Sequence, residues 1–73
     1  MQFYTVRVIM NEKGERLQTC KIIKDHTRLG LQTCAFLYAN MPFMLYSGRC
    51  RNTARELTRR LRNAGCVVES KIL

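Results

Sequence analysis

Cys20, Asp25 and His26 are the residues whose types could support nucleophilic catalysis, with the thiol as nucleophile and the imidazole as its base. The segment that holds them has the pattern of a helix, and at about 100° per residue Cys20 falls on its apolar side. Cys20 and His26 are six residues apart, which along a helix is too far for direct contact. A histidine at the edge of an apolar helix face is more often structural, so we expect the protein not to be an enzyme.

The cysteines, at positions 20, 34, 50 and 66, could instead bind a metal ion or form disulfides. No two of them have the short spacing of a zinc-binding pair, and His26 is the only histidine. The sequence shows neither a signal peptide nor an apolar run long enough for a membrane helix, so we expect a cytoplasmic protein, in which disulfides are disfavoured. We predict no cofactor and small buried or capping cysteines; a metal site built from four distant cysteines is the alternative.

A binding surface is better supported, by the segment from Leu17 to Leu31, LQTCKIIKDHTRLGL, which predicts a helix, a glycine turn and the start of a second helix. One side of the first helix can enter a core and carries Thr19, Cys20, Ile22 and Ile23. Leu17, Lys21 and Lys24 fall together on the other side. Folding does not require an apolar residue and two cations to lie together on the side of the helix opposite the core. These three residues are therefore candidates for partner binding.

A row of arginines is a second candidate surface. Within roughly 80° of arc, one side of a predicted helix over residues 51–64 carries Arg51, Arg55, Arg59 and Arg62. Glu56 is the only acid between Gly48 and Ala64, so most of these arginines lack an obvious local ion-pair partner. A solvated helix face and a surface for phosphate or an acidic protein both remain open. The tyrosines and phenylalanines are not interleaved with the row as base-stacking platforms would be.

Length and charge limit the possible functions. The 73 residues predict a single domain, too small to enclose an active site between domains. The formal net charge of +8 favours an acidic partner, which could be RNA, DNA or an acidic protein face, although charge also keeps a small protein soluble.

The elements that must position these residues follow from hydrophobic periodicity and turn residues. We expect strands at 3–10 and 66–73, helices at 16–27, 31–39 and 51–64, and a brief strand or packed loop at 43–47. This order predicts an α+β two-layer fold, with a three-stranded antiparallel sheet and three helices packed on one face.

Several local features refine this prediction. In the first strand, the residues expected on one face are Tyr4, Val6, Val8 and Met10. Gly30 should supply the joint between the first two helices, and Gly65 should stop the third. Thr53 and Glu56 have capping-box spacing, with Cys50 or Asn52 as alternative caps. The stripes expected in the core are Cys34, Leu37 and Tyr38 on the second helix and Ala54, Leu57, Leu61 and Ala64 on the third.

An ordered set of motifs resembles a known family. The motifs are TRLGL at 27–31, MP at 41–42, Gly48, ARELTRRL at 54–61 and AGCVVESK at 64–71. The C-terminal domain of the bacterial ribosomal stalk protein is similar, with a TGLGL turn, a proline before a short middle segment, a glycine ahead of a charged helix and an AGAxVExK ending. The resemblance extends from about Val6 to Lys71. More distantly, the chain also resembles the Clp protease adaptor in its fold.

The resemblance implies a docking module, because in that family the domain recruits the GTPase factors of translation through its first two helices. Leu17, Lys21 and Lys24 match the family's apolar, lysine and basic contact positions. Leu31 matches a contact leucine at the start of the second helix.

This sequence differs from the family on both candidate surfaces. Ala35 replaces a lysine and Phe36 an acid, so the second helix is more apolar, while the family's acidic third helix is arginine-rich here. The family's N-terminal dimerisation segment and hinge have no counterpart, so we expect a free-standing basic variant that is not anchored in the manner of the stalk.

Two binding functions follow. The first is a non-enzymatic module that docks on an acidic protein partner, such as a translation factor or ribosome-associated protein, through Leu17, Lys21, Lys24, Leu31, Ala35 and Phe36. The alternative is an RNA- or DNA-binding protein, such as a phage or prophage regulator, that uses Arg51, Arg55, Arg59 and Arg62. The sequence leaves the partner, the oligomeric state and the biological setting open.

Overall fold

The computed structural model of the protein describes residues 2–73, and it confirms the predicted order of strands and helices. The elements are β1 (Tyr4–Asn11), α1 (Arg16–Thr27), α2 (Leu31–Ala39), β2 (Phe43–Gly48), α3 (Arg51–Asn63) and β3 (Cys66–Ile72). The segment expected as a strand or packed loop is therefore a strand, and the α+β fold class is confirmed.

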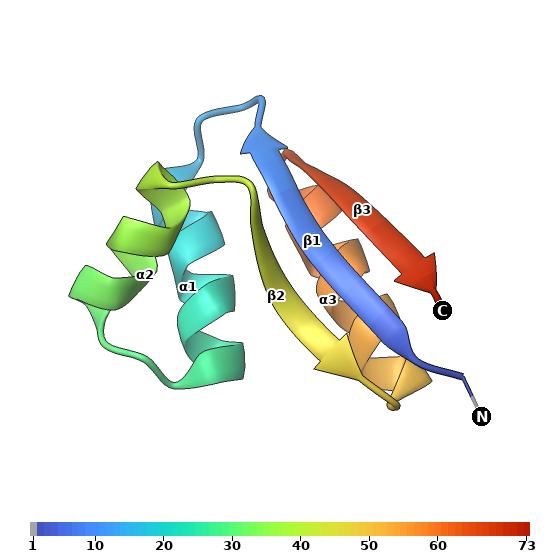
Figure 1. Cartoon of the computed structure of the whole chain (residues 1–73). Helices are drawn as coiled ribbons and strands as arrows, with labels where there is room; N and C mark the ends of the chain where they lie inside the picture. Colours follow the sequence, from blue (N-terminus) through green and yellow to red (C-terminus); the bar gives the residue numbers. More distant parts are fainter. Residues whose placement is uncertain (1) are drawn as a thin grey trace.

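β1 is the central strand of an antiparallel sheet ordered β2-β1-β3 (Figure 1). Tyr4, Val6 and Val8 are buried on the side that faces the core, as alternation predicts. The prediction that Met10 continues this face is wrong, because the pairing of β1 with β3 shifts between Val8 and Met10. The irregularity reverses the alternation of side chains, so Met10 is 48% exposed.

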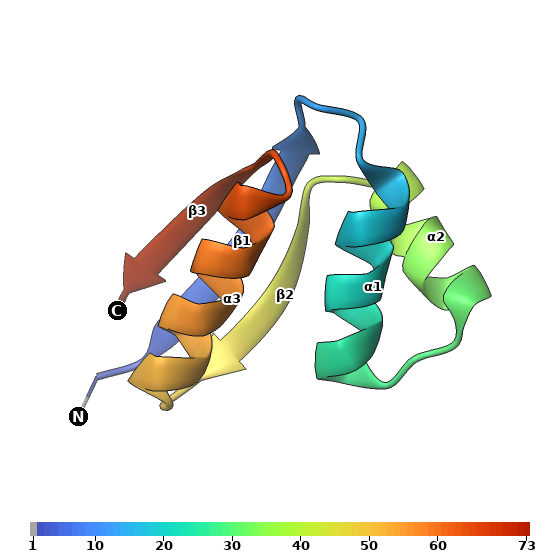
Figure 2. The same cartoon turned by 180° about the vertical axis from the view of Figure 1, so that it is seen from behind.

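The helices form a layer on one side of the sheet. α3 packs on β3 and β1, α1 lies beside α3, and α2 packs chiefly on α1 at the margin of the layer (Figure 2). The stripes predicted for α1 and α3 are buried: Thr19, Cys20, Ile22, Ile23, Ala54, Leu57, Leu61 and Ala64. On α2, Cys34 is fully buried, while Leu37 and Tyr38 are partly buried against the core.

The helix ends differ in part from the expected chemistry. The left-handed residue after α1 is Arg28, with φ of 60°, whereas Gly30 is extended and begins α2. At the start of α3, Cys50 occupies the N-cap position, and the Thr53 hydroxyl donates a hydrogen bond to the Cys50 thiol instead of forming a capping box. Gly65 follows α3 with φ of 89°, a left-handed conformation that glycine tolerates, as predicted.

Thr19 ties α1 to the sheet through its fully buried hydroxyl group. The hydroxyl donates to the Glu15 carbonyl oxygen at 3.0 Å and accepts a hydrogen bond from the Asn11 side-chain amide at 2.8 Å. Its oxygen also lies 3.4 Å from the Cys66 sulfur. One polar atom therefore joins the first turn of α1 to the end of β1 and the start of β3.

Replacing Thr19→Val should destabilise the protein by about 1 to 3 kcal/mol, because the Asn11 amide would lose its buried acceptor. Thr58→Val is the matched control: the Thr58 hydroxyl is also buried but donates only to the Ala54 carbonyl oxygen of its own helix, so its loss should cost less than about 1 kcal/mol. Urea denaturation followed by circular dichroism measures both values. Equal losses would show that Thr19 contributes no more than a local helix contact.

Candidate functional site

The outer side of α1 presents an exposed leucine and two exposed lysines. Leu17 is 86% exposed, and Lys21 and Lys24 are exposed beside it, while the opposite side of α1 fills the core. Cys20 lies on the side of α1 that packs toward α2, since the two helices contact each other and Cys20 and Cys34 both belong to the buried core. Burial and, to a smaller extent, the nearby Cys34 thiol raise the pKa of the Cys20 thiol. At about 100° per residue, Lys24, Leu17 and Lys21 lie about 40°, 60° and 100° round α1 from Cys20, all in the same rotational sense. They therefore border the side of α1 that adjoins α2.

On α2, Leu31 is 63% exposed, Ala35 is half-buried and Phe36 is 65% exposed. Leu31 and Ala35 lie about 60° and 100° round α2 from Cys34, in the same rotational sense as the α1 residues from Cys20. The two helices run antiparallel (Figures 1 and 2), so these rotations bring both groups to one side of the helical hairpin. Phe36 lies about 200° from Cys34 and faces away.

We call Leu17, Lys21, Lys24, Leu31 and Ala35 the docking face. The structure thus brings together five of the six residues predicted for partner binding and places Phe36 on the outer side of α2. Between residues 2 and 73, neither Lys21 nor Lys24 has an acidic group within 4.0 Å. Asp25, the neighbouring acid on α1, pairs with Arg60 of α3 at 3.3 Å. The docking face is therefore apolar and positively charged.

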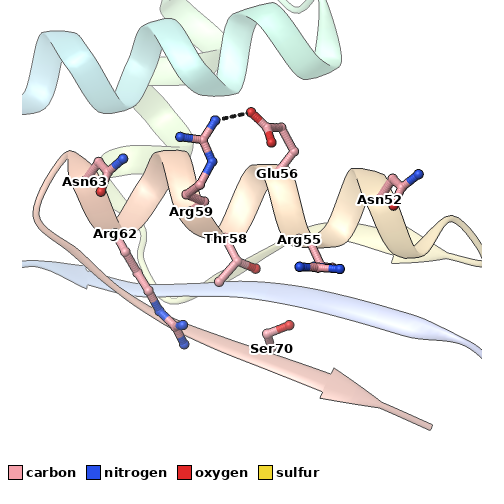
Figure 3. Close-up of a pocket in the computed structure, with 8 residues that line it drawn as sticks. All are labelled: Asn52, Arg55, Glu56, Thr58, Arg59, Arg62, Asn63 and Ser70. Carbon is pink, nitrogen blue, oxygen red and sulfur yellow. Dashed lines mark hydrogen bonds and ion pairs between the residues drawn. The ribbon is translucent and has the colours of Figure 1, made fainter.

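The arginine row lies along an open groove beside α3 and β3. The groove has a volume of about 760 Å³ and is lined by Asn52, Arg55, Glu56, Thr58, Arg59, Arg62, Asn63 and Ser70 (Figure 3). Three of the four predicted arginines line it, and Arg51, in the first turn of α3, does not. Sequence reasoning considered Asn52 only as a helix cap, and it did not single out Thr58, Asn63 or Ser70. The three on α3 could have been found from the helical positions next to the row, but Ser70 required knowledge of the sheet.

The arginines of the groove have different partners. Arg59 pairs with Glu56, and the hydrogen bond from Arg59 lowers the pKa of the Glu56 carboxyl group. Arg62 donates to the Val68 carbonyl oxygen of β3 at 3.2 Å. In Figure 3, Arg55 and Arg62 extend toward the sheet side of α3, whereas Arg59 turns away toward Glu56. The row is therefore divided, with Arg55 and Arg62 directed to the same side.

Cys20 and His26, which were considered for catalysis, lie in different surroundings. The His26 ring packs edge-on against Tyr46 with ring centroids 5.7 Å apart, and Cys20 is buried. In the described part of the chain, no three His, Cys, Asp or Glu side chains are grouped so that they could hold a metal ion. None of the helices within residues 2–73 has the length and apolarity needed to cross a membrane.

Comparison with known proteins finds a distant similarity to a ribosomal protein. No protein-family model matches the chain. The chain is similar to the large ribosomal subunit protein bL12 of Coprothermobacter proteolyticus, with 33% identity over 63 residues, which are 85% of this chain and 50% of that protein. The resemblance to a ribosomal stalk protein is thus supported by a distant similarity, and the chain spans about half the length of this curated relative.

The exposed Cys50 differs chemically from the other cysteines. All four are free, and Cys20, Cys34 and Cys66 are buried. The hydrogen bond from the Thr53 hydroxyl, 3.1 Å from the Cys50 sulfur, lowers the pKa of this thiol. Burial raises the pKa of the Cys20 and Cys66 thiols. Exposure and thiolate content therefore both favour reaction at Cys50.

Native protein treated with a thiol-reactive disulfide reagent near pH 7.5 should show one fast thiol, and Cys50→Ser should abolish this phase. Thr53→Ala should move the pH midpoint of the fast phase upward, because it removes the hydrogen bond that stabilises the thiolate. Unfolded protein, in which all four thiols react, serves as the control for total thiol content. A fast phase that survives Cys50→Ser would contradict the described burial.

Proposed function

We propose that this chain is a non-enzymatic docking module that binds an acidic, partly apolar protein partner through the docking face. The partner class is a translation factor or another ribosome-associated protein, which would make the cytoplasm its place of action. In this proposal residues 1–73 form a single module that resembles the C-terminal domain of the stalk protein.

The observation that carries this proposal is found on one side of the α1–α2 hairpin, where exposed leucines lie beside lysines that have no acidic partner within residues 2–73. Leu17 and Leu31 are 86% and 63% exposed, although the opposite sides of their helices contribute to the core. Exposed aliphatic side chains gain free energy when a partner removes them from water. Lys21 and Lys24 add charge that favours an acidic partner and disfavours a basic one.

The distant similarity to bL12 supports the same function. The stalk family, which the sequence resembles, docks its partners through the first two helices, and the docking face lies on the corresponding helices of this chain. Ala35 restricts the kind of partner that would fit. It stands where the family has a lysine, and its side chain is shorter and apolar. The partner should therefore offer an apolar group beside its acidic residues.

Lys21→Glu/Lys24→Glu should weaken binding to a purified translational GTPase by about tenfold or more, because acidic groups would then face an acidic partner. Isothermal titration calorimetry against individual purified GTPases measures the change. Raising the salt concentration should weaken binding by the wild type more than binding by this variant, since screening acts on the attraction that the variant lacks.

Arg51→Glu/Arg55→Glu is the matched control, because it changes the net charge equally at two exposed arginines of α3. This variant should retain wild-type affinity within about threefold. Equal weakening by both variants would indicate attraction by overall charge, and unchanged binding by the lysine variant would rule out the docking face.

A further inference from the structure

The groove beside α3 and β3 is lined by charged and polar residues that the proposed docking function does not use. Its lining combines three arginines with two asparagines, a threonine and a serine, and contains a single acid. Arg55 and Arg62 extend from α3 toward the side on which Ser70 of β3 lies (Figure 3). Two guanidinium groups therefore stand over a shallow surface supplied by a helix and a strand.

The electrostatics of this groove favour an anion. Glu56, its one acid, is engaged by Arg59, so its charge is already compensated. Within residues 2–73, Arg55 and Arg62 form no ion pair with any acidic group. Arg62 is also held by its hydrogen bond to the Val68 carbonyl oxygen, which reduces the conformational entropy that binding would remove.

The residues that line the groove help to decide between an acidic protein and a nucleic acid as its partner. A protein partner would ordinarily cover apolar side chains at the centre of its interface, and the groove is lined only by charged, amide and hydroxyl side chains. The arginine, asparagine and serine side chains among them suit phosphate oxygens, since these residues are usual donors to a nucleic-acid backbone, whereas the buried Thr58 hydroxyl already donates to the Ala54 carbonyl oxygen. No aromatic ring lines the groove, so it has no platform on which bases could stack.

We infer that the α3–β3 groove binds the phosphodiester backbone of a nucleic acid without reading its sequence, with Arg55 and Arg62 as the principal contacts. The site is separate from the docking face, because α2 lies at the opposite margin of the helix layer from β3 (Figures 1 and 2). The inference therefore does not depend on the proposed protein partner.

Fluorescence anisotropy with labelled RNA and DNA duplexes of the same sequence, from 25 to 200 mM KCl, tests this inference. The wild type should bind both duplexes, with affinity that falls steeply with salt. Arg55→Gln/Arg62→Gln should weaken binding about tenfold or more at low salt and reduce the salt slope on DNA by about two, because roughly 0.9 is lost per phosphate contact. A second duplex sequence should bind equally well.

Lys21→Gln/Lys24→Gln removes the same charge from the docking face and should leave the salt slope unchanged. If Arg62→Gln disturbs folding in a circular-dichroism melt, Arg55→Gln alone decides the question, with a loss of about one unit of slope expected. The inference is overturned if no duplex binds at 25 mM KCl, if the lysine and arginine variants weaken binding equally, or if polyglutamate of matched charge displaces the duplex as readily as unlabelled RNA does.

Discussion

The burial of one side of α1 is the constraint on which the rest of the structure depends. Thr19 fixes the first turn of the helix to β1 and β3 through a hydroxyl with no access to water, and Ile23 fills the core one turn later. Cys20 then faces α2, which packs chiefly on α1. With these contacts made, the rotation of α1 is determined, and Leu17, Lys21 and Lys24 must face solvent.

The surplus of positive charge is distributed unevenly over the fold. Acids partner arginines at three places, where Asp25 meets Arg60, Glu56 meets Arg59 and Glu69 lies near Arg7. The lysines of the docking face and the sheet-directed arginines of α3 are left without such partners in residues 2–73. The two faces differ in their remaining chemistry, because exposed leucines accompany the lysines, whereas amides and hydroxyls accompany the arginines. This difference is why we assign a protein to one and a phosphate backbone to the other.

Periodicity in the sequence was sufficient to predict the elements and their buried sides. Thr19 is followed at helical spacing by Ile22 and Ile23 in α1, Leu57 is followed by Leu61 in α3, and β1 alternates. It could not predict features that depend on contacts between elements. The irregularity that exposes Met10 arises from pairing with β3, and the division of the arginine row depends on the Val68 carbonyl oxygen within reach of Arg62. The orientation of Phe36, by contrast, could have been predicted, since helical spacing alone puts it about 200° from the core residue Cys34 and about 140° from Leu31.

Mapping of amide chemical shifts by NMR during titration with a purified translational GTPase tests the central claim most directly, because it locates the contact without altering any residue. The account predicts that the shifted amides cluster on α1 and the first half of α2, around Leu17, Lys21, Lys24, Leu31 and Ala35, with little change at Phe36 or along α3. Shifts concentrated on α3 and β3, or on the open face of the sheet, would contradict the assignment of the docking face.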